Sequence, residues 1–217
     1  MSDIFEYWSK YRPPNWFHPD DWPTLCRVKH HFNMSVLPVP FTGPLKCAPV
    51  TLLYLAPGLS RSDYSKAKSE EGHREKLRRL LGCEPLSTPK EHKEGWTWWQ
   101  SRTKRLGPWE KLRSKIAILE ICPYHSKRFH DWELLSALAS CRTSIEWAQD
   151  VLFPEAEAGE RVVICLRAPK YWGLKLGKQY KQGLFAPRTN RGGYMMKTAM
   201  RRRITGAVQE ILSFGRD

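Results

Sequence analysis

The sequence places one carboxylic acid inside an apolar run, where an acid is least expected. Glu120 interrupts the run KIAILEICP (115–123), and the other residues from 116 to 122 are all apolar. A carboxylate there costs free energy unless it is paired or used, so we expect a functional role. When ionised it only accepts hydrogen bonds, whereas a protonated Glu120 can donate and accept at once. The alternative is a buried ion pair with Arg167 or Arg188.

Asp63 and His125 are the other two candidates for acid–base chemistry. Asp63 follows Ser60 shortly after the motif LAPG (55–58), and it could polarise a water molecule. Alternatively, Ser60 or Asp63 merely caps the helix that follows. His125 comes just after the second apolar run and could donate a proton to a leaving group or contact a phosphate. A solvent-facing histidine with no role is its alternative.

Several common chemistries lack their motifs in this chain. The sequence contains no GxxxxGK[ST], no GxGxxG after the first apolar run, and neither HExxH nor GxSxG. Nucleotide-phosphate binding, zinc-protease and serine-hydrolase chemistry therefore have no support. The six cysteines are far apart and form no CxxC, which disfavours disulfides, zinc ribbons and cysteine-ligated iron–sulfur clusters. We expect no metal and no cofactor.

The apolar runs predict the elements that hold these residues. The runs 50–58, 115–123 and 161–169 are typical of buried parallel strands, and 182–187 predicts a short fourth strand. Helices are expected between and after the strands, at 62–81, 131–152 and 194–213. This alternation predicts a three-layer α/β/α fold around a central, mostly parallel, four-stranded sheet.

We expect one domain over residues 1–217, with three parts. An irregular, aromatic N-terminal arm spans 1–36 with one short helix near 20–31, the core spans 37–195, and a basic helix occupies 194–217. The Trp-rich stretch 84–108 is expected to be a loop. In such sheets the site lies beyond the carboxyl ends of the strands. The site segments are therefore predicted at 56–64, 120–128 and 186–194, with 167–172 beside them.

Composition indicates the class of partner. The 217 residues include 36 Lys and Arg against 22 Asp and Glu, a formal net charge of +14. This charge predicts a polyanionic partner, of which nucleic acid is the commonest, and ten tryptophans suit both a core and base stacking. A basic protein with a Trp-rich core is the alternative. Without a signal-peptide run or a membrane-spanning run, we expect a cytoplasmic protein with no membrane partner.

Three segments together resemble the motifs of the uracil-DNA glycosylase superfamily. LPVPFTGPLKCAPVTLLYLAPGLSRSDY (37–64) is similar to the lead-in and first catalytic motif, with LAPG close to the Ala-Pro variants of thermophile-type branches. ILEICPYHS (118–126) resembles the second motif, closest to the Asn-Leu-Cys-Pro of the single-strand-selective monofunctional branch. GLFAPRTNRGGY (183–194) is similar to the His-Pro-Ser-Pro loop that enters the minor groove. The order of the three motifs carries the resemblance.

The resemblance implies a monofunctional DNA glycosylase, expected to be a monomer, that flips a base out of DNA and hydrolyses its N-glycosidic bond. Its catalytic residues would be Asp63, Glu120 and His125. Its base pocket would be formed by Ala56, Pro57, Gly58, Ser60 and, as an aromatic wall, Tyr124. Its contacts to duplex or single-stranded DNA would come from Arg188, Asn190 and Arg191 in the last motif and from Arg201, Arg202 and Arg203 on the C-terminal helix.

The sequence departs from the family pattern at the positions that hold the attacking water and recognise the base. Ala56 stands where many branches have Asp or Asn to hold water, and Glu120 replaces the base-reading asparagine. The motif histidine is lost to Phe185 or Ala186. An ionised Glu120 would accept from the N4 amino group of cytosine and repel O4 of uracil, so we expect excision of a modified cytosine, such as those of phage DNA. The alternatives are uracil excision in DNA repair and an inactive DNA-binding protein of the same fold.

Overall fold

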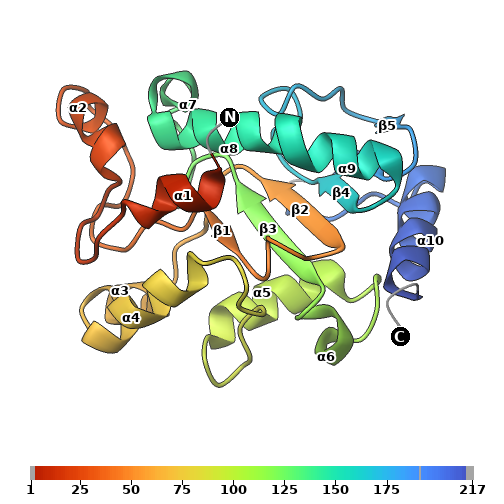
Figure 1. Ribbon diagram of the computed structural model, residues 1–217, viewed down its shortest axis with the longest axis horizontal. Coiled ribbons are helices and arrows are strands. Elements are labelled where there is room, and N and C mark those ends of the chain that lie inside the picture. The colour runs from red at the N-terminus through yellow and green to blue at the C-terminus, as the bar shows by residue number, and fades with distance from the viewer. Residues whose placement is uncertain (1–2, 191, 214–217) are drawn as a thin grey trace.

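The computed structural model describes residues 3–190 and 192–213 and builds them around one mixed sheet (Figure 1). Within these residues the sheet has six strands in the order β1-β3-β2-β4-β6-β5. Strands β3, β2, β4 and β6 run parallel to one another. At the two edges, β1 pairs antiparallel with β3 and β5 pairs antiparallel with β6. The strand bounds are Phe41–Thr42 (β1), Val50–Tyr54 (β2), Ile116–Glu120 (β3), Val162–Cys165 (β4), Lys178–Tyr180 (β5) and Leu184–Ala186 (β6).

The mostly parallel sheet is confirmed, and its four parallel strands coincide with the four predicted ones. All residues of β2, β3 and β4 are buried, as continuous apolar runs require when both faces of a sheet are covered. Alternate side chains enter opposite cores: Leu53 and Leu119 face one, while Leu52 and Ile118 face the other. The prediction of four strands missed the antiparallel edges β1 and β5, which are too short to show a period.

Helices cover both faces of the sheet, so the predicted three layers are present (Figure 1). On one face lie α1 (Ile4–Ser9), α8 (Ala139–Trp147) and α9 (Phe153–Ala158). On the other lie α5 (Lys93–Thr103), α6 (Trp109–Leu112) and α10 (Ala199–Ser213). The remaining short helices are η1 (Pro19–Asp21), α2 (Trp22–Leu25), α3 (Arg61–Ala67), α4 (Glu70–Arg79), α7 (Leu134–Ala137) and the π-helical turn η2 (Ala148–Leu152).

Two predicted helices are divided in the structure. The helix expected at 62–81 consists of α3 and α4, because Ser69 stops the first and caps the second by accepting from the amide of Gly72. The helix expected at 131–152 is broken at Leu138, whose backbone is extended, and then continues through η2 to α9. It ends at Gly159, which has the left-handed φ of +84° that favours glycine.

The Trp-rich stretch 84–108, expected to be a loop, contains the helix α5 (Lys93–Thr103). Its α5 lacks a clear helical period in sequence, yet Trp96, Trp98 and Trp99 all pack against the core on that face of the sheet. Trp98 and Trp99 are adjacent in sequence, so the three rings do not form a single apolar stripe along the helix. Tertiary packing thus forms a helix that local propensity does not predict.

The N-terminal segment is part of the core and not an irregular arm. Ile4, Trp8 and Tyr11 are fully buried against the sheet, and Asp3 caps α1 through the amide of Phe5. The C-terminal helix begins at Ala199, five residues later than predicted. In the described part of the chain, none of the helices combines the length and apolar character needed to cross a bilayer.

Candidate functional site

A cavity of about 820 Å³ lies beyond the carboxyl ends of β2, β3 and β4. Its volume falls within the roughly 300–1,000 Å³ of typical ligand sites. The loops that follow these three strands form part of its wall, as the parallel topology predicts, and helices α3, α4 and α5 contribute further residues. The cavity brings together seven of the predicted site residues: Ala56, Pro57, Gly58, Ser60, Asp63, Glu120 and His125.

Glu120 ends β3 with its carboxyl group in this cavity. The residue is only 4% exposed, and its Oε2 is buried without a hydrogen-bond partner among the described residues. None of the ion pairs identified among the described residues includes Glu120, so the alternative of a buried ion pair finds no support there. Burial raises the pKa of Glu120 well above its ordinary value. Burial therefore favours the protonated, neutral form of this side chain.

Aromatic rings line the same cavity as this acid. Tyr54 is its register partner on β2, and the Tyr54 ring packs edge-on against Trp98 at 5.2 Å and Trp99 at 5.6 Å between centroids. Trp98 and Trp99 line the cavity, and the guanidinium of Arg102 lies 4.4 Å from the Trp98 ring. These tryptophans were not predicted as site residues, because the stretch that contains them was expected to be a loop. Their clustering was the signal that could have pointed to the site.

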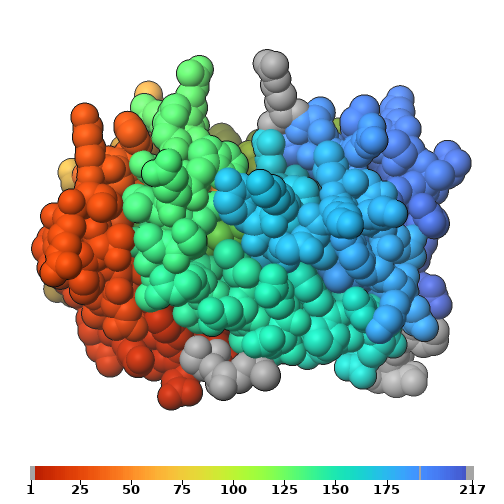
Figure 2. All heavy atoms as spheres, turned by 90° about the horizontal axis from the view of Figure 1, so that it is seen from above, coloured from red at the N-terminus to blue at the C-terminus, as the bar shows by residue number. Residues whose placement is uncertain are grey.

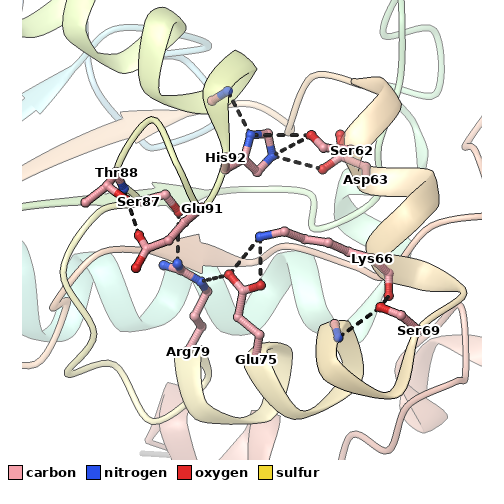
Figure 3. Close-up of polar contacts among 12 residues, drawn as sticks. Ser62, Asp63, Lys66, Ser69, Glu75, Arg79, Ser87, Thr88, Glu91 and His92 are labelled. Atoms are coloured by element: carbon pink, nitrogen blue, oxygen red, sulfur yellow. Dashed lines mark hydrogen bonds and ion pairs between the residues drawn. The ribbon is translucent and has the colours of Figure 1, made fainter.

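Asp63 faces the same cavity and also caps α3. The amide and hydroxyl of Ser60 both donate to its Oδ2 at 2.7 Å, so the capping alternative is confirmed. Nε2 of His92 lies 3.4 Å from Oδ1, and Figure 3 shows the His92 ring directed toward both Asp63 and Ser62. Burial raises the pKa of Asp63, but His92, His125 and Ser60 outweigh it and lower the pKa to about 2. Asp63 is therefore ionised at neutral pH and lines the cavity.

His92 was not predicted, although it orients Asp63. Its Nδ1 accepts from the amide of Gly95 at 2.9 Å and caps α5, so the proton of a neutral ring resides on Nε2. That Nε2 faces Oδ1 of Asp63, as Figure 3 shows. The first turn of α5 thus fixes both the position and the hydrogen-bonding role of this imidazole. A helix start predicted at His92 was the one sequence signal that could have identified this residue as part of the site.

His125 is buried and not a solvent-facing loop residue. It is 3% exposed, and its Nδ1 donates to the carbonyl oxygen of Gly58 in the first motif. The same Nδ1 lies 3.8 Å from Oδ2 of Asp63. Burial lowers the pKa of His125 more than Asp63 and Gly58 raise it, so the ring is neutral near pH 7. His125 therefore joins the loops that follow β2 and β3.

Basic residues of α3 and α4 form another part of the cavity wall. Lys66 and Arg79 share the carboxylate of Glu75, at 2.7 Å for each closest pair (Figure 3). Lys76 lines the cavity and is buried, but no carboxylate of the described residues pairs with it. Burial, with a smaller contribution from Arg79, lowers the pKa of Lys76 to about 7. This buried amine could not be predicted, because the sequence of α4 is typical of a charged surface helix.

Tyr124 does not form a wall of the cavity, contrary to prediction. Its ring lies in the core on the opposite face of the sheet from Glu120, against Phe32 at 5.4 Å. Its hydroxyl donates to Asp21 at 2.5 Å and accepts from the amide of His18. The N-terminal segment, expected to be an irregular arm, therefore engages this tyrosine and draws it away from the cavity.

The predicted DNA-binding residues that the structure describes are not part of the cavity lining. Arg188 is exposed, whereas Asn190 uses its Oδ1 to accept from the amides of Gly192 and Tyr194 and so shapes its own loop. That loop packs near the site, since a Cβ added at Gly193 would lie 3.6 Å from the Tyr54 ring. Arg191 falls outside the described residues. On α10, Arg201 is half-buried and Arg202 and Arg203 are exposed.

The cavity thus combines a neutral carboxylic acid, an ionised carboxylate and a neutral imidazole. Such a set can orient a water molecule on one side of a substrate and donate a hydrogen bond on the other. Within the described residues, no three His, Cys, Asp or Glu side chains are grouped so as to hold a metal ion. Comparison of the chain with protein-family models, with curated proteins and with solved structures finds no match in any of the three.

Proposed function

We propose that this protein is a DNA glycosylase with a uracil-DNA-glycosylase-like fold, which excises a modified cytosine and leaves an abasic site. The observation that carries the proposal is the neutral, unsatisfied Glu120 in an aromatic-lined cavity. The three motifs that resemble the superfamily support it, because all three follow parallel strands of one sheet. The net charge of +14 suits a polyanionic substrate.

A protonated Glu120 matches the pairing edge of cytosine. Its hydroxyl donates to the N3 acceptor while its carbonyl oxygen accepts from the N4 amino group. Burial favours this protonation state by raising the pKa of Glu120, and it is one of the two states considered from the sequence. The cavity volume of about 820 Å³ leaves room for a substituent on the base.

Uracil is the second candidate, and the raised pKa of Glu120 is the observation that favours it. With the roles of its two oxygens exchanged, the neutral acid accepts from uracil N3–H and donates to O4. An ionised carboxylate could not do this, because it has no proton to donate. The neutral state therefore brings uracil closer to cytosine as a substrate than the sequence alone predicts.

The reaction divides between Glu120 and Asp63. The bond from C1′ to the base nitrogen breaks with its electron pair going to the base, and the sugar develops oxocarbenium character. Glu120 gives its proton to the departing base. A water molecule polarised by the ionised Asp63 adds its oxygen to C1′, and its released proton passes to Asp63 and then to solvent. Both carboxyl groups then return to their starting states by exchange with solvent.

His125 has a positioning role in this scheme rather than the acid role expected from the sequence. Its Nδ1 proton is engaged by the carbonyl oxygen of Gly58, and burial keeps the ring neutral by lowering its pKa. It therefore holds the loop of the first motif in place beside Asp63.

The test is mass spectrometry of released bases. Protein is incubated with DNA that contains uracil, cytosine, 5-hydroxymethylcytosine or glucosylated 5-hydroxymethylcytosine. Release of a modified cytosine, lost in Glu120→Ala and Asp63→Asn but kept in the surface control Glu110→Gln, supports the proposal. Faster release of uracil than of every cytosine derivative would favour the second candidate. No release from any substrate, together with retained DNA binding, would indicate an inactive DNA-binding protein.

A further inference from the structure

Two exposed aromatic rings form a stacked pair beside the mouth of the cavity. Trp132 and Tyr171 have ring centroids 5.2 Å apart and planes inclined by 27°, and they are 40% and 37% exposed. Trp132 lines the cavity together with Phe129, whose ring meets it edge-on at 5.0 Å. Neither Trp132 nor Tyr171 belongs to a core cluster of the described residues. The pair therefore lies outside the hydrophobic cores and keeps two large rings partly exposed.

The pair is built by two loops at the carboxyl edge of the sheet. Trp132 lies in the segment after β3 and Tyr171 in the segment after β4, and Figure 2 shows the green and blue surfaces of these segments side by side. The amide of Tyr171 donates to the carbonyl oxygen of Ala168 at 2.9 Å, and the carbonyl oxygen of Trp132 accepts from the amide of Leu135 in α7. Backbone hydrogen bonds thus fix the rings at the rim.

Cationic side chains flank the two rings. Lys127, Arg128 and Lys170 are exposed on the same two segments, and the first two also line the cavity. The nearby carboxylate of Asp131 is occupied, since it accepts from the amide of His31 at 3.1 Å and contacts its ring at 3.0 Å. Glu133 is the remaining exposed acid of this loop. The rim therefore offers aromatic faces among a surplus of positive charge.

We propose that Trp132 and Tyr171 are a stacking platform for unpaired bases of single-stranded DNA, with Lys127, Arg128 and Lys170 along its phosphates. Exposed aromatic faces next to cations suit single strands, because every unpaired base has a π-face to stack. In a duplex, neighbouring base pairs already cover these faces. The proposal deepens the proposed function, since it rests on the same cavity and names single-stranded DNA as the form presented to it. None of the motif segments contains either ring.

The test measures binding without excision. A fluorescently labelled oligodeoxythymidine, which contains none of the candidate target bases, is titrated with the full-length protein as a single strand and as a duplex with oligodeoxyadenosine. Fluorescence anisotropy then gives both affinities. The variants are Trp132→Ala, Tyr171→Ala and the conservative Trp132→Phe. The matched control is Trp22→Ala, which removes another exposed tryptophan, 48% exposed, that lines neither described cavity.

We expect the single strand to bind at least about ten-fold more tightly than the duplex. Each alanine variant should weaken single-strand binding by roughly ten-fold, whereas Trp132→Phe and Trp22→Ala should retain it. Equal or tighter binding of the duplex would overturn the proposal, as would alanine variants that bind the single strand like wild type. A folded Trp132→Phe keeps the comparison valid if an alanine variant unfolds. Excision of a modified base from duplex DNA without single-strand preference would contradict only this inference, and binding without excision would contradict only the glycosylase.

Discussion

Glu120 and Tyr54 are register partners on adjacent parallel strands, yet Oε2 of the acid and the hydroxyl of the tyrosine are both buried without a hydrogen-bond partner among the described residues. Buried polar groups are nearly always satisfied, and each one left unsatisfied costs about 1–3 kcal/mol. Two such groups at the same end of one pair of strands, in the wall of one cavity, indicate a site that a ligand completes.

The protonation state of Glu120 predicts how stability depends on pH. Burial raises its pKa, so the folded protein keeps this proton at pH values where the unfolded chain, with a pKa of about 4.3, has released it. Stability therefore falls as pH rises above that value, until the pKa of the folded state is passed. Glu120→Gln removes this loss, so its stability advantage over wild type should grow with pH in urea unfolding between pH 5 and 8. Parallel curves for the two proteins, with Glu110→Gln as the surface control, would show that Glu120 is ionised in the fold.

The same protonation state predicts the effect of Glu120 variants on excision. Gln carries one donor and one acceptor, as the neutral acid does, so Glu120→Gln should still bind the flipped base. It should slow the chemical step, because an amide cannot hand a proton to the departing base. Glu120→Ala leaves the pairing edge of the base without partners and should lose a further ten-fold or more. Single-turnover excision measures both variants. Equal rates for Ala and Gln would show that Glu120 does not recognise the base.

The lowered pKa of Asp63 predicts that its carboxylate stabilises the fold and that acid removes this contribution. Its pKa is lowered from 3.8 to about 2, so the ionised form stabilises the fold by roughly 2 kcal/mol above pH 4. This contribution disappears as pH falls from about 4 to 2, because the folded state must then take up the proton. Asp63→Asn should be less stable than wild type at pH 7 and nearly equal to it at pH 2, and it should also lose excision.

Denaturation of both proteins at pH 7 and pH 2 checks the prediction for Asp63. His92→Ala serves as a second variant, because it removes one donor to Asp63 but leaves the hydrogen bonds from Ser60. It should show a smaller loss in the same direction. A constant difference between wild type and Asp63→Asn across this pH range would contradict the assignment.

The sequence was most informative where burial is continuous. The runs around Leu52, Ile118 and Ile164 predict the central strands and therefore the edge where Glu120 and Asp63 meet. It was least informative where tertiary contacts decide the outcome. Trp98 and Trp99 belong to a helix without a clear apolar period, so neither the helix nor its place beside Glu120 could be predicted.

Tyr124 illustrates a second limit of sequence reasoning. Its motif position suggested a pocket wall, but its partner Asp21 is 103 residues away in the chain and determines which side of the sheet it faces. Contacts over such distances leave no periodic signal. The same reason explains why the buried N-terminal helix was expected to be part of an irregular arm.

Lys76 is a buried amine without a carboxylate partner in the described chain, and this burial predicts how stability depends on pH above neutrality. Burial lowers its pKa from 10.5 to about 7, so the folded state binds fewer protons than the unfolded chain between these values. Wild-type stability should therefore rise with pH across this window, and below pH 7 the full cost of burying the charge applies. Lys76→Met should be more stable than wild type at pH 7 and lose most of that advantage near pH 10.

Lys66→Met is the matched comparison for Lys76→Met, since Lys66 lies on the same cavity wall but pairs with Glu75 at 2.7 Å. Removal of Lys66 leaves Glu75 with fewer partners, so this variant should be less stable than wild type at pH 7. Urea unfolding of the three proteins at pH 7 and pH 10 separates the two lysines. If Lys76→Met were destabilised to the same extent at both pH values, the Lys76 amine would be charged and satisfied in the folded protein, and the cavity would hold a cation where we place a neutral amine.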